Sequence, residues 1–465
     1  MPYTPTGISW SRYRLVSILM TVFGLVPVVV FLAIGRQAFA LAYLAIGASF
    51  LILTAPRYGF YLFMAANYVY APFYTRFFAI HPGDVCALLF IGAVVISWIF
   101  RHSSRIGKTC FDFPLMALVA ATVISGIFAF SPELSLVPIG RIIFIYLAYR
   151  GIYTFSESYD PARMVRFMIH LHAFVSLGHT ILFFGRGGAW RIFGVTGVGF
   201  ETFSLVLVPL TLAHAIWART ARQQLKYTGF FLVGLLAALA TMSRGPVMTI
   251  AIACPILLAV SYYKARKLNH ARATGYVSRF ALAVVPILVF LLIGTNAYQL
   301  LGTRMEQLVA ERATGTIETR LSLWKAALES FRLSPVTGIG IGNYWLLDDL
   351  LPHLKFDPVR FMVAGLSFHN VFLQYLSETG ILGVSALLFL AGSVFSAGRR
   401  ILVRVTDFED MTLSLSVFVF SFIFCITIFY MRVWTWGQEG FILAFNLAIL
   451  ARWHKTTSDG DMTES

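Results

Sequence analysis

The sequence predicts an all-α protein, a polytopic transmembrane helical bundle of about 12–14 spans with one long, partly helical loop on the outer side. Three observations carry this prediction. Hydrophobic residues make up 58% of the 465 residues and charged residues only 12%, whereas soluble domains contain about 45–50% apolar and about 25% charged residues. The apolar stretches are about as long as the roughly 20 residues that span a bilayer. Lys and Arg residues gather on alternate sides of successive stretches.

The composition also excludes several classes. So large an apolar fraction does not fit into one soluble core, and disordered chains are polar. The apolar runs are too long and too little alternating for a membrane β-barrel. The formal charge of +15 lacks the basic runs with interleaved aromatics that a nucleic-acid partner would need. The four scattered cysteines predict neither a disulfide framework nor a zinc site.

Fourteen spans are expected along the chain. They are 15–34, 38–55, 59–77, 84–100, 112–130, 136–150, 163–184, 198–217, 228–242, 245–263, 279–296, 369–396, 411–430 and 438–453. Residues 1–296 thus hold transmembrane helices 1–11, and 297–368 form a long outer loop with amphipathic helices. The C-terminal transmembrane helices lie within 369–453, and 454–465 are expected to be a disordered cytoplasmic tail.

The distribution of cations sets the orientation. With the N-terminus inside, 22 of the 36 Lys and Arg residues fall in inner segments and seven in the short outer segments. The remaining seven lie in the long outer loop. The positive-inside rule is obeyed loop after loop, so both termini are expected inside.

Four outward arginines sit at span ends, where that rule does not require them. Arg186 and Arg191 lie in GRGGAWRIFG, Arg244 in TMSRGP and Arg432 in MRVWTWG. Guanidinium groups bind phosphate through two parallel hydrogen bonds, and a charge wedged between two spans is costly and usually functional. We therefore expect an anionic ligand at the outer face, and a lipid diphosphate fits best. For Arg432, pairing with Glu439 or anchoring beside two tryptophans is an equally open interpretation.

The long outer loop contains a predicted helix and a glycine-rich turn. TRLSLWKAALESF (319–331) places Leu321, Trp324, Leu328 and Phe331 on one helical stripe, which predicts a helix on the bilayer surface or covering the bundle. TGIGIGNYW (337–345) follows. Its glycines neither follow a strand nor start a clear helix, which favours a tight backbone turn near the site over a nucleotide-binding loop.

His369 is the first polar residue of the span that begins in SFHNVFLQYLSETGILG (367–383). On a helix, Gly380 lies about 20° from His369 in projection, and Gly383 lies near the same stripe. Two glycines there let a neighbouring helix pack closely, with His369 and Asn370 at the mouth of the interface. A lone interfacial His is often only an anchor, but the outward arginines favour a functional one.

In this order, the segments resemble the O-antigen ligase and O-antigen (exopolysaccharide) polymerase superfamily of bacterial membrane glycosyltransferases. The resembling pieces are the Arg191 segment, TMSRGP, RLSLWKAAL with SPVTGIGIGNY, and HNVFLQYLSETGILG, which together cover about 186–383. No single piece is specific, since His followed by ten residues and Gly is a loose pattern. The ordered set, with the long outer loop just before the His, is fairly specific.

The resemblance implies a GT-C-like glycosyltransferase in the bacterial inner membrane, with cytoplasmic termini and a periplasmic active site. The donor would be a glycan on undecaprenyl diphosphate. The acceptor would be lipid A–core in a ligase or another lipid-linked repeat unit in a polymerase. Membrane lipids are a further expected partner. No cofactor and no nucleic-acid partner are expected, and the oligomeric state is left open.

The resemblance also assigns residues. It maps the family's histidine onto His369, its outward arginines onto Arg191 and Arg244, and its loop arginine onto Arg320. The residues expected to bind the donor diphosphate are Arg186, Arg191, Arg244, Arg320 and Arg432, with Asn370, Gly380 and Gly383 in support.

The chemistry expected is a single displacement that inverts the anomeric carbon. Positioned arginines would stabilise the departing diphosphate, the role that metals play elsewhere, and no Asp-x-Asp motif lies in the outer segments, so no metal is expected. His369 would accept the hydroxyl proton. Glu201, Glu378 and Glu439 are the alternative bases.

The ligase is the first choice, because of the pattern from His369 to Gly380. Two Arg-x10-Gly patterns, Arg186 to Gly197 and Arg304 to Gly315, and the count of fourteen spans favour a polymerase. A transporter or flippase of lipid-linked glycans is the third alternative. It is disfavoured because the sequence shows no internal repeat and the polar candidates gather at the outer face, whereas transporter sites lie at the bilayer midplane.

Overall fold

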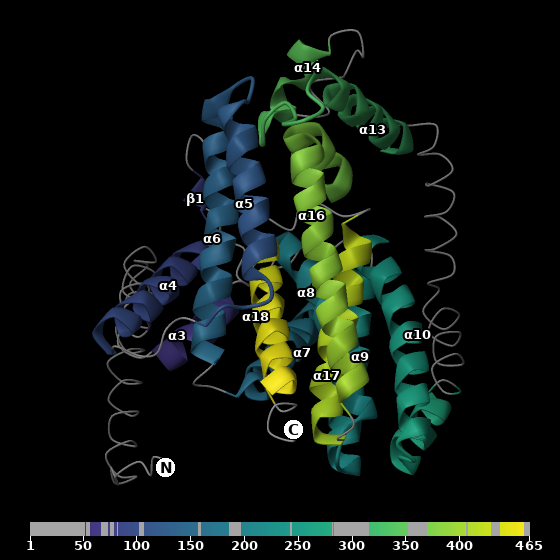
Figure 1. Ribbon diagram of the computed structural model, residues 1–465. Helices are drawn as coiled ribbons and strands as arrows, with labels where there is room; N and C mark the ends of the chain where they lie inside the picture. Colours follow the sequence, from purple (N-terminus) through teal and green to yellow (C-terminus); the bar gives the residue numbers. More distant parts are fainter. Residues whose placement is uncertain are drawn as a thin grey trace, which may run out of the picture. The chain divides into compact units, whose positions relative to one another are not determined.

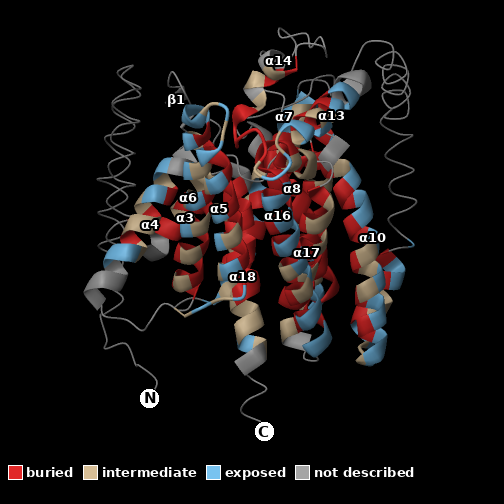
Figure 2. Cartoon of the chain, turned by 45° about the horizontal axis from the view of Figure 1, so that its top comes forward, coloured by how far each residue is buried: buried red, intermediate tan, exposed pale blue. Residues whose placement is uncertain are grey.

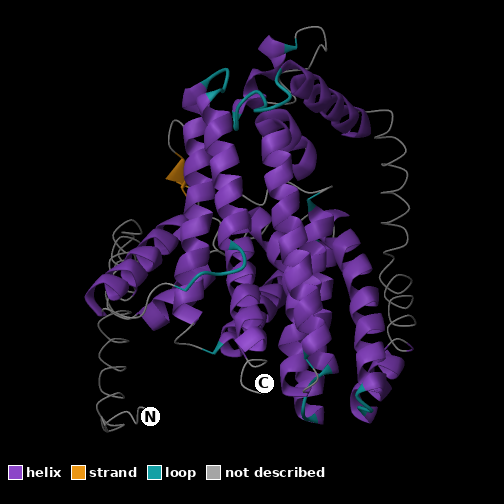
Figure 3. Cartoon of the chain, in the orientation of Figure 1, coloured by secondary structure: helices purple, strands orange, loops and turns teal. Residues whose placement is uncertain are grey.

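The computed structural model is an all-α bundle of a multi-pass membrane protein, which confirms the predicted fold class (Figures 1 and 3). Five of the described helices are long and apolar enough to cross a membrane, so the total of 12–14 spans stays a prediction. The structure describes residues 52, 56–66, 73–74, 79–80, 82–101, 107–156, 160–185, 197–241, 244–280, 282, 316–351, 370–405, 408–428 and 438–459.

The described helices fall into two compact units. Unit 1 contains α3 (Pro56–Ala66) and α4 (Pro82–Arg101). These two helices pack through aromatic rings, because Phe63 and Phe90 stack with centroids 5.7 Å apart and Phe60 lies 5.9 Å from Phe90. Unit 2 holds all the remaining described elements, including the site described below.

One expected span is corrected by the structure. The third, at 59–77, is helical only as far as Ala66, where α3 ends. Residues Phe73–Tyr74 form the strand β1, which pairs antiparallel with β2 at Ala79–Ile80. The strand β1 lies inside the expected range, so that range is not one continuous helix. α3, with 11 residues, is shorter than the roughly 20 residues that a span needs.

The helices of unit 2 lie within or around the other expected spans that the structure describes, except for α13 and α14, which lie in the outer loop expected at 297–368. They are α5 (Asp112–Ile127), α6 (Pro132–Ser156), α7 (Pro161–Gly185), α8 (Gly197–Ile216), α9 (Ala221–Ala240), α10 (Arg244–Lys267), α13 (Thr316–Leu333), α14 (Leu347–Leu350), α16 (Val371–Arg404), α17 (Phe408–Thr427) and α18 (Gln438–Asp459), with the 3₁₀ turn η1 at Asn343–Leu346.

Local chemistry explains several helix starts. Pro56, Pro82, Pro132 and Pro161 are the first residues of their helices, the position where proline's fixed φ fits and its missing N–H costs nothing. Thr220 caps α9 by accepting a hydrogen bond from the Gln223 N–H (3.2 Å). The sequence therefore marks where many of these helices begin.

α8 lies at the centre of unit 2. Its residues from Thr202 through Ile216 are buried on every face, as Figure 2 shows in red, and a helix that is apolar all round belongs in a core. It packs against α9, α10 and α17. α16 in turn packs against α5, α17 and α18.

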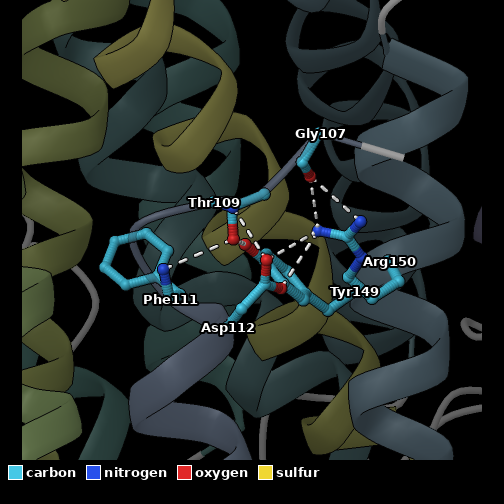
Figure 4. A network of polar contacts seen from close by, with 6 residues as sticks. All are labelled: Gly107, Thr109, Phe111, Asp112, Tyr149 and Arg150. Carbon is cyan, nitrogen blue, oxygen red and sulfur yellow. Dashed lines mark hydrogen bonds and ion pairs between the residues drawn. The ribbon is translucent and has the colours of Figure 1, made fainter. Parts of the chain in front are cut away.

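An ion pair fixes the loop before α5. Arg150 of α6 lies 2.9 Å from the Asp112 carboxylate and also donates two 3.1 Å hydrogen bonds to the Gly107 carbonyl. Asp112 accepts a further bond from the Thr109 N–H (2.7 Å), and the Thr109 hydroxyl contacts that of Tyr149 (Figure 4). Both charged side chains are largely buried. Removing one partner of such a pair leaves the other uncompensated.

We expect Arg150→Ala to lower the free energy of unfolding by about 1–3 kcal/mol, because the Asp112 carboxylate loses its charged partner and the Gly107 carbonyl loses its hydrogen bonds from Arg150. The measurement is the melting temperature of the purified protein in detergent. Arg163→Ala is the matched control, because Arg163 pairs with Asp160 on the surface and such pairs contribute less than about 1 kcal/mol. Equal melting temperatures for the two variants would contradict a stabilising role of the Arg150–Asp112 ion pair.

Candidate functional site

Four of the six residues predicted to act in catalysis or to bind the donor lie outside the described residues. These are His369, Arg186, Arg191 and Arg432. Arg244 is the first residue of α10 and Arg320 lies in the first half of α13. The structure describes the backbone of these two residues but not their side chains. Their roles therefore stay predictions.

Helix directions show that the described starts of α10, α16 and α18 lie at one end of unit 2. Lys264, near the end of α10, donates a 3.3 Å hydrogen bond to the carbonyl of Val405, directly after α16. The indole of Trp453, near the end of α18, donates to the Ser414 hydroxyl near the start of α17 (3.1 Å). At the other end, the Phe372 N–H at the start of α16 donates to the Ile428 carbonyl after α17 (3.0 Å).

The start of α8 lies at this same end, because short connections join α8 to α9 and α9 to α10. In the sequence, Arg186 and Arg191 fall between α7 and α8, and Arg432 falls between α17 and α18. His369 directly precedes Asn370, the cap of α16. The helix ends next to these predicted site residues thus all lie at the same end of unit 2. We call this end the outer end, following the orientation predicted from the sequence.

Asn370 fixes the start of α16. Its backbone is extended, and its side-chain oxygen accepts a 3.0 Å hydrogen bond from the Leu373 N–H. This N-cap satisfies one of the N–H groups that a helix start leaves open. The bond from Phe372 to Ile428 satisfies another. The chain that follows His369 is therefore anchored to both its own helix and the end of α17.

Gly380 breaks α16. Its φ of 61° and ψ of −157° are non-helical, a conformation that essentially only glycine adopts. The part of α16 after Gly380 is about 36 Å long at 1.5 Å per residue, so it can cross a hydrocarbon core of about 30 Å by itself. The turns from Val371 to Thr379 extend this helix at the outer end. We call them the α16 head.

The segment 335–344, which we call the glycine loop, bridges this break with backbone hydrogen bonds. The N–H groups of Ile339 and Gly340 donate to the carbonyls of Ser377 and Glu378, both at 3.0 Å. Across the break, the N–H groups of Ile381 and Leu382 donate to the carbonyls of Pro335 and Val336, at 2.9 and 3.3 Å. Backbone groups that the break frees are thereby paired, as an apolar surrounding requires.

The close approach explains the spacing of glycines in TGIGIGNYW. Gly338, Gly340 and Gly342 have φ values of 70°, 105° and 80°, and a methyl group on Gly338 would overlap the carbonyl of Glu378. The expected tight turn is present, and it is tight because it lies directly against the broken helix.

A cluster of buried polar side chains joins the glycine loop to α5 and α16. Glu378 is fully buried; one carboxylate oxygen accepts the Tyr344 N–H (3.3 Å) and the other accepts the Gln374 amide (3.2 Å). The Ser125 hydroxyl of α5 donates to the Glu378 carbonyl (2.6 Å) and accepts the Ile341 N–H (3.1 Å). Among the described residues, Glu378 forms no ion pair.

Asn343 fastens the loop to the turn between α5 and α6. Its amide oxygen accepts the Ser131 N–H (2.8 Å), and its amide nitrogen donates to the Ser131 carbonyl and the Ser135 hydroxyl (3.2 and 3.1 Å). The Phe130 N–H donates to the Ile339 carbonyl (3.1 Å). The glycine loop, the α5–α6 turn and the α16 head therefore form one connected layer at the outer end (Figure 1).

α13 covers this layer, but not with the predicted face. Leu321 and Leu328 of the expected stripe are exposed, whereas Leu323, Ala326 and Ala327 are buried against Ile339 and Leu347. The correction has a steric reason, because a helix that approaches α16 closely needs small residues at the contact. The buried face of α13 is thus offset from the predicted stripe, of which Trp324 still packs against the buried cluster. The helix itself is where the pattern predicts it, and contact of the exposed leucines with the bilayer surface stays a prediction.

The expected role of Gly380 in helix packing is wrong. The atoms nearest to a side chain on Gly380 belong to Val336 and Gly338 of the glycine loop, and those nearest to one on Gly383 belong to Thr379 of the same helix. Gly380 makes room for the glycine loop, and the packing role of Gly383 stays a prediction. Gly380 instead permits the helix break, which helical projection cannot reveal because it assumes a continuous helix.

No group of three or more His, Cys, Asp or Glu side chains within the described ranges is placed to hold a metal ion. The chemistry that the described layer itself offers is hydrogen bonding from a rigid, largely backbone scaffold. Sequence reasoning missed Ser125 and Asn343 and weighed Glu378 only as a base. The spacing of Asn370, Gln374 and Glu378 at every fourth residue was the signal for a polar face.

Comparison with known proteins supports the family resemblance. Residues 229–388 match the family model described as O-antigen ligase. Over 102 residues, the chain is 30% identical to the exopolysaccharide production protein ExoQ of Rhizobium meliloti (strain 1021). That match covers 21% of this chain and 23% of the relative, so the chain spans about a quarter of that protein's length. The predicted resemblance to the O-antigen ligase and polymerase superfamily is thereby confirmed.

The matched stretch contains the break, the glycine loop, Arg244, Arg320 and His369. Arg186, Arg191 and Arg432 lie outside it, as does Ser125. The layer at the outer end is thus built mostly, but not wholly, from the family domain.

We expect Gly380→Ala to destabilise the protein by at least about 2 kcal/mol, since alanine is strained in this backbone conformation and its methyl group would meet the Val336 carbonyl. Gly392→Ala in the same helix is the matched control. A side chain there meets no atom within 4 Å, and helical Gly→Ala substitutions stabilise by up to about 1 kcal/mol. Melting temperatures in detergent measure both, and an unchanged value for Gly380→Ala would contradict the break.

Proposed function

We propose that the protein is a glycosyltransferase that moves a glycan from undecaprenyl diphosphate to a saccharide acceptor at the periplasmic face of the inner membrane. The observation that carries the proposal is the match of residues 229–388 to the O-antigen ligase model. That stretch contains His369 and Arg244 in the predicted order. The helix ends that flank the predicted site residues support it further, because those described lie at one end of unit 2.

Arg244 has a physical argument of its own. A cation in the first turn of a helix is unfavourable, because the helix N-terminus already carries a partial positive charge. A bound anion reverses this, since it interacts favourably with both the guanidinium and the open N–H groups of the helix. An arginine at the start of α10 therefore suits the diphosphate of a lipid-linked donor.

The proposed reaction is a single displacement. The acceptor hydroxyl oxygen forms a bond to the anomeric carbon while the bond from that carbon to the diphosphate oxygen breaks, so the configuration inverts. The hydroxyl proton passes to His369. Arg191 and Arg244, with Arg186, Arg320 and Arg432, stabilise the negative charge on the leaving diphosphate without a metal ion.

The first candidate is an O-antigen ligase acting on lipid A–core. The second is a polymerase that joins lipid-linked repeat units. The similarity to a protein named for exopolysaccharide production favours this second candidate. The two differ only in the acceptor, so acceptor choice in a transfer assay distinguishes them.

The test is transfer by the purified protein, with EDTA present and an undecaprenyl-diphosphate glycan as donor. Lipid A–core and further lipid-linked repeat units are offered separately. Product on lipid A–core identifies a ligase, and a ladder of longer lipid-linked chains identifies a polymerase. Absence of any product from folded protein would contradict the proposal and favour a transporter.

We expect His369→Ala to lower kcat by about 10²–10⁴-fold. Arg244→Ala is expected to lower kcat/KM for the donor by about 10²-fold or more, because charge on the leaving group is no longer stabilised. Arg399→Ala is the control, since this exposed arginine lies at the opposite end of α16. Melting temperatures confirm that each variant is folded. An active His369→Ala variant would move the base to one of the glutamates.

A further inference from the structure

The α16 head stands between the break at Gly380 and the residue that the proposed mechanism uses as base. Glu378 lies nine residues after His369 in the sequence. The head is anchored at its start by Asn370 and Ile428, and at its end by the glycine loop. The position and direction of the α16 head are therefore fixed by contacts at both of its ends.

Backbone hydrogen bonds alone do not fix the glycine loop fully. They pair the loop with the helix only around residues 335–340. Further along the loop, the Tyr344 N–H bonds the Glu378 carboxylate, which the Gln374 amide holds from the other side. The carboxylate thus ties the far part of the loop to the middle of the head.

The chemistry of this contact suits a carboxylate. The Tyr344 N–H and the Gln374 amide donate to different oxygens of the side chain, and carboxylate oxygens can accept both bonds. A glutamine at position 378 would point its amide N–H group at the Gln374 amide nitrogen, so two donors would face each other. Gln374 can adjust, however, because its own amide oxygen is buried and has no hydrogen-bond partner among the described residues. A flip of that amide restores an acceptor for the new N–H group.

We propose that Glu378 is a positioning residue for glycosyl transfer. By holding the Tyr344 N–H and the Gln374 amide, it fixes the glycine loop against the α16 head and so sets where His369 meets the acceptor hydroxyl. This inference rests on the proposed function. It differs from a role of Glu378 as the base, because the carboxylate is fully buried and the inference requires only its capacity to accept hydrogen bonds.

Glu378→Ala and Glu378→Gln separate these roles. Positioning predicts that Glu378→Ala lowers kcat by about 10–100-fold, the order expected when a reacting group is misplaced by about 1 Å, while KM for the donor changes by less than about twofold. Glu378→Gln is expected to keep at least about a third of the wild-type kcat, since its amide can keep the Tyr344 contact and Gln374 can flip.

Two further variants test the same connection without changing Glu378. Ser125→Ala removes the hydroxyl that joins Ile341 to the Glu378 carbonyl, and a smaller loss of kcat in the same direction is expected. Ser393→Ala is the matched control, because this half-buried serine of α16 donates to the Phe389 carbonyl of its own helix and, among the described residues, makes no bond to the glycine loop. Its kcat is expected to be unchanged.

The assay is the transfer reaction above, with kcat expressed per folded protein and melting temperatures recorded. A wild-type kcat in Glu378→Ala would overturn the inference, as would a Glu378→Gln variant as inactive as Glu378→Ala, which would indicate a role in proton transfer. If Glu378→Ala does not fold, an unchanged kcat in Ser125→Ala overturns it. Failure of the wild-type protein to transfer would instead contradict the proposed function.

Discussion

A backbone N–H or C=O group buried in an apolar surrounding must find a partner, and the break in α16 makes this constraint acute. The glycine loop meets it with four hydrogen bonds that pair residues 335–340 with residues 377–382 on both sides of Gly380. Without the loop, the freed groups would be left open at a cost of several kcal/mol each. The helix can break there only because a second segment, distant in sequence, replaces its missing hydrogen bonds.

This constraint gives the outer loop a fixed place. The glycine loop is held in place by its hydrogen bonds to α16. Asn343 and Ser125 extend this connection to α5 and to the turn between α5 and α6. α13 follows, because its buried face packs on Ile339 of the same loop. Segments that lie more than 200 residues apart in the sequence thereby share one layer. This layer lies at the outer end of unit 2, where helix ends flank the predicted site residues.

The layer also relates the family domain to the rest of the chain. The match to O-antigen ligase covers residues 229–388, yet Ser125, Ser131 and Ser135 come from helices before it. The glycine-rich motif of the domain therefore depends on α5 and α6 for its anchoring. Under the proposed function such rigidity would suit catalysis, because groups held in place need no reorganisation when charge develops on the leaving group.

The sequence by itself determined the fold class, the approximate helices and the family resemblance, because apolar length, cation placement and motif order can be read without knowing how the helices pack. It also placed a tight turn at TGIGIGNYW. Only the tertiary structure decided that Gly380 breaks its helix, that Leu323, Ala326 and Ala327 are the buried face of α13, and that Glu378 joins a loop to a helix. These depend on which segment lies opposite, and neither hydrophobic periodicity nor helical projection contains that information. A polar residue such as Ser125 gave no signal, since its importance comes from partners 216 and 253 residues away.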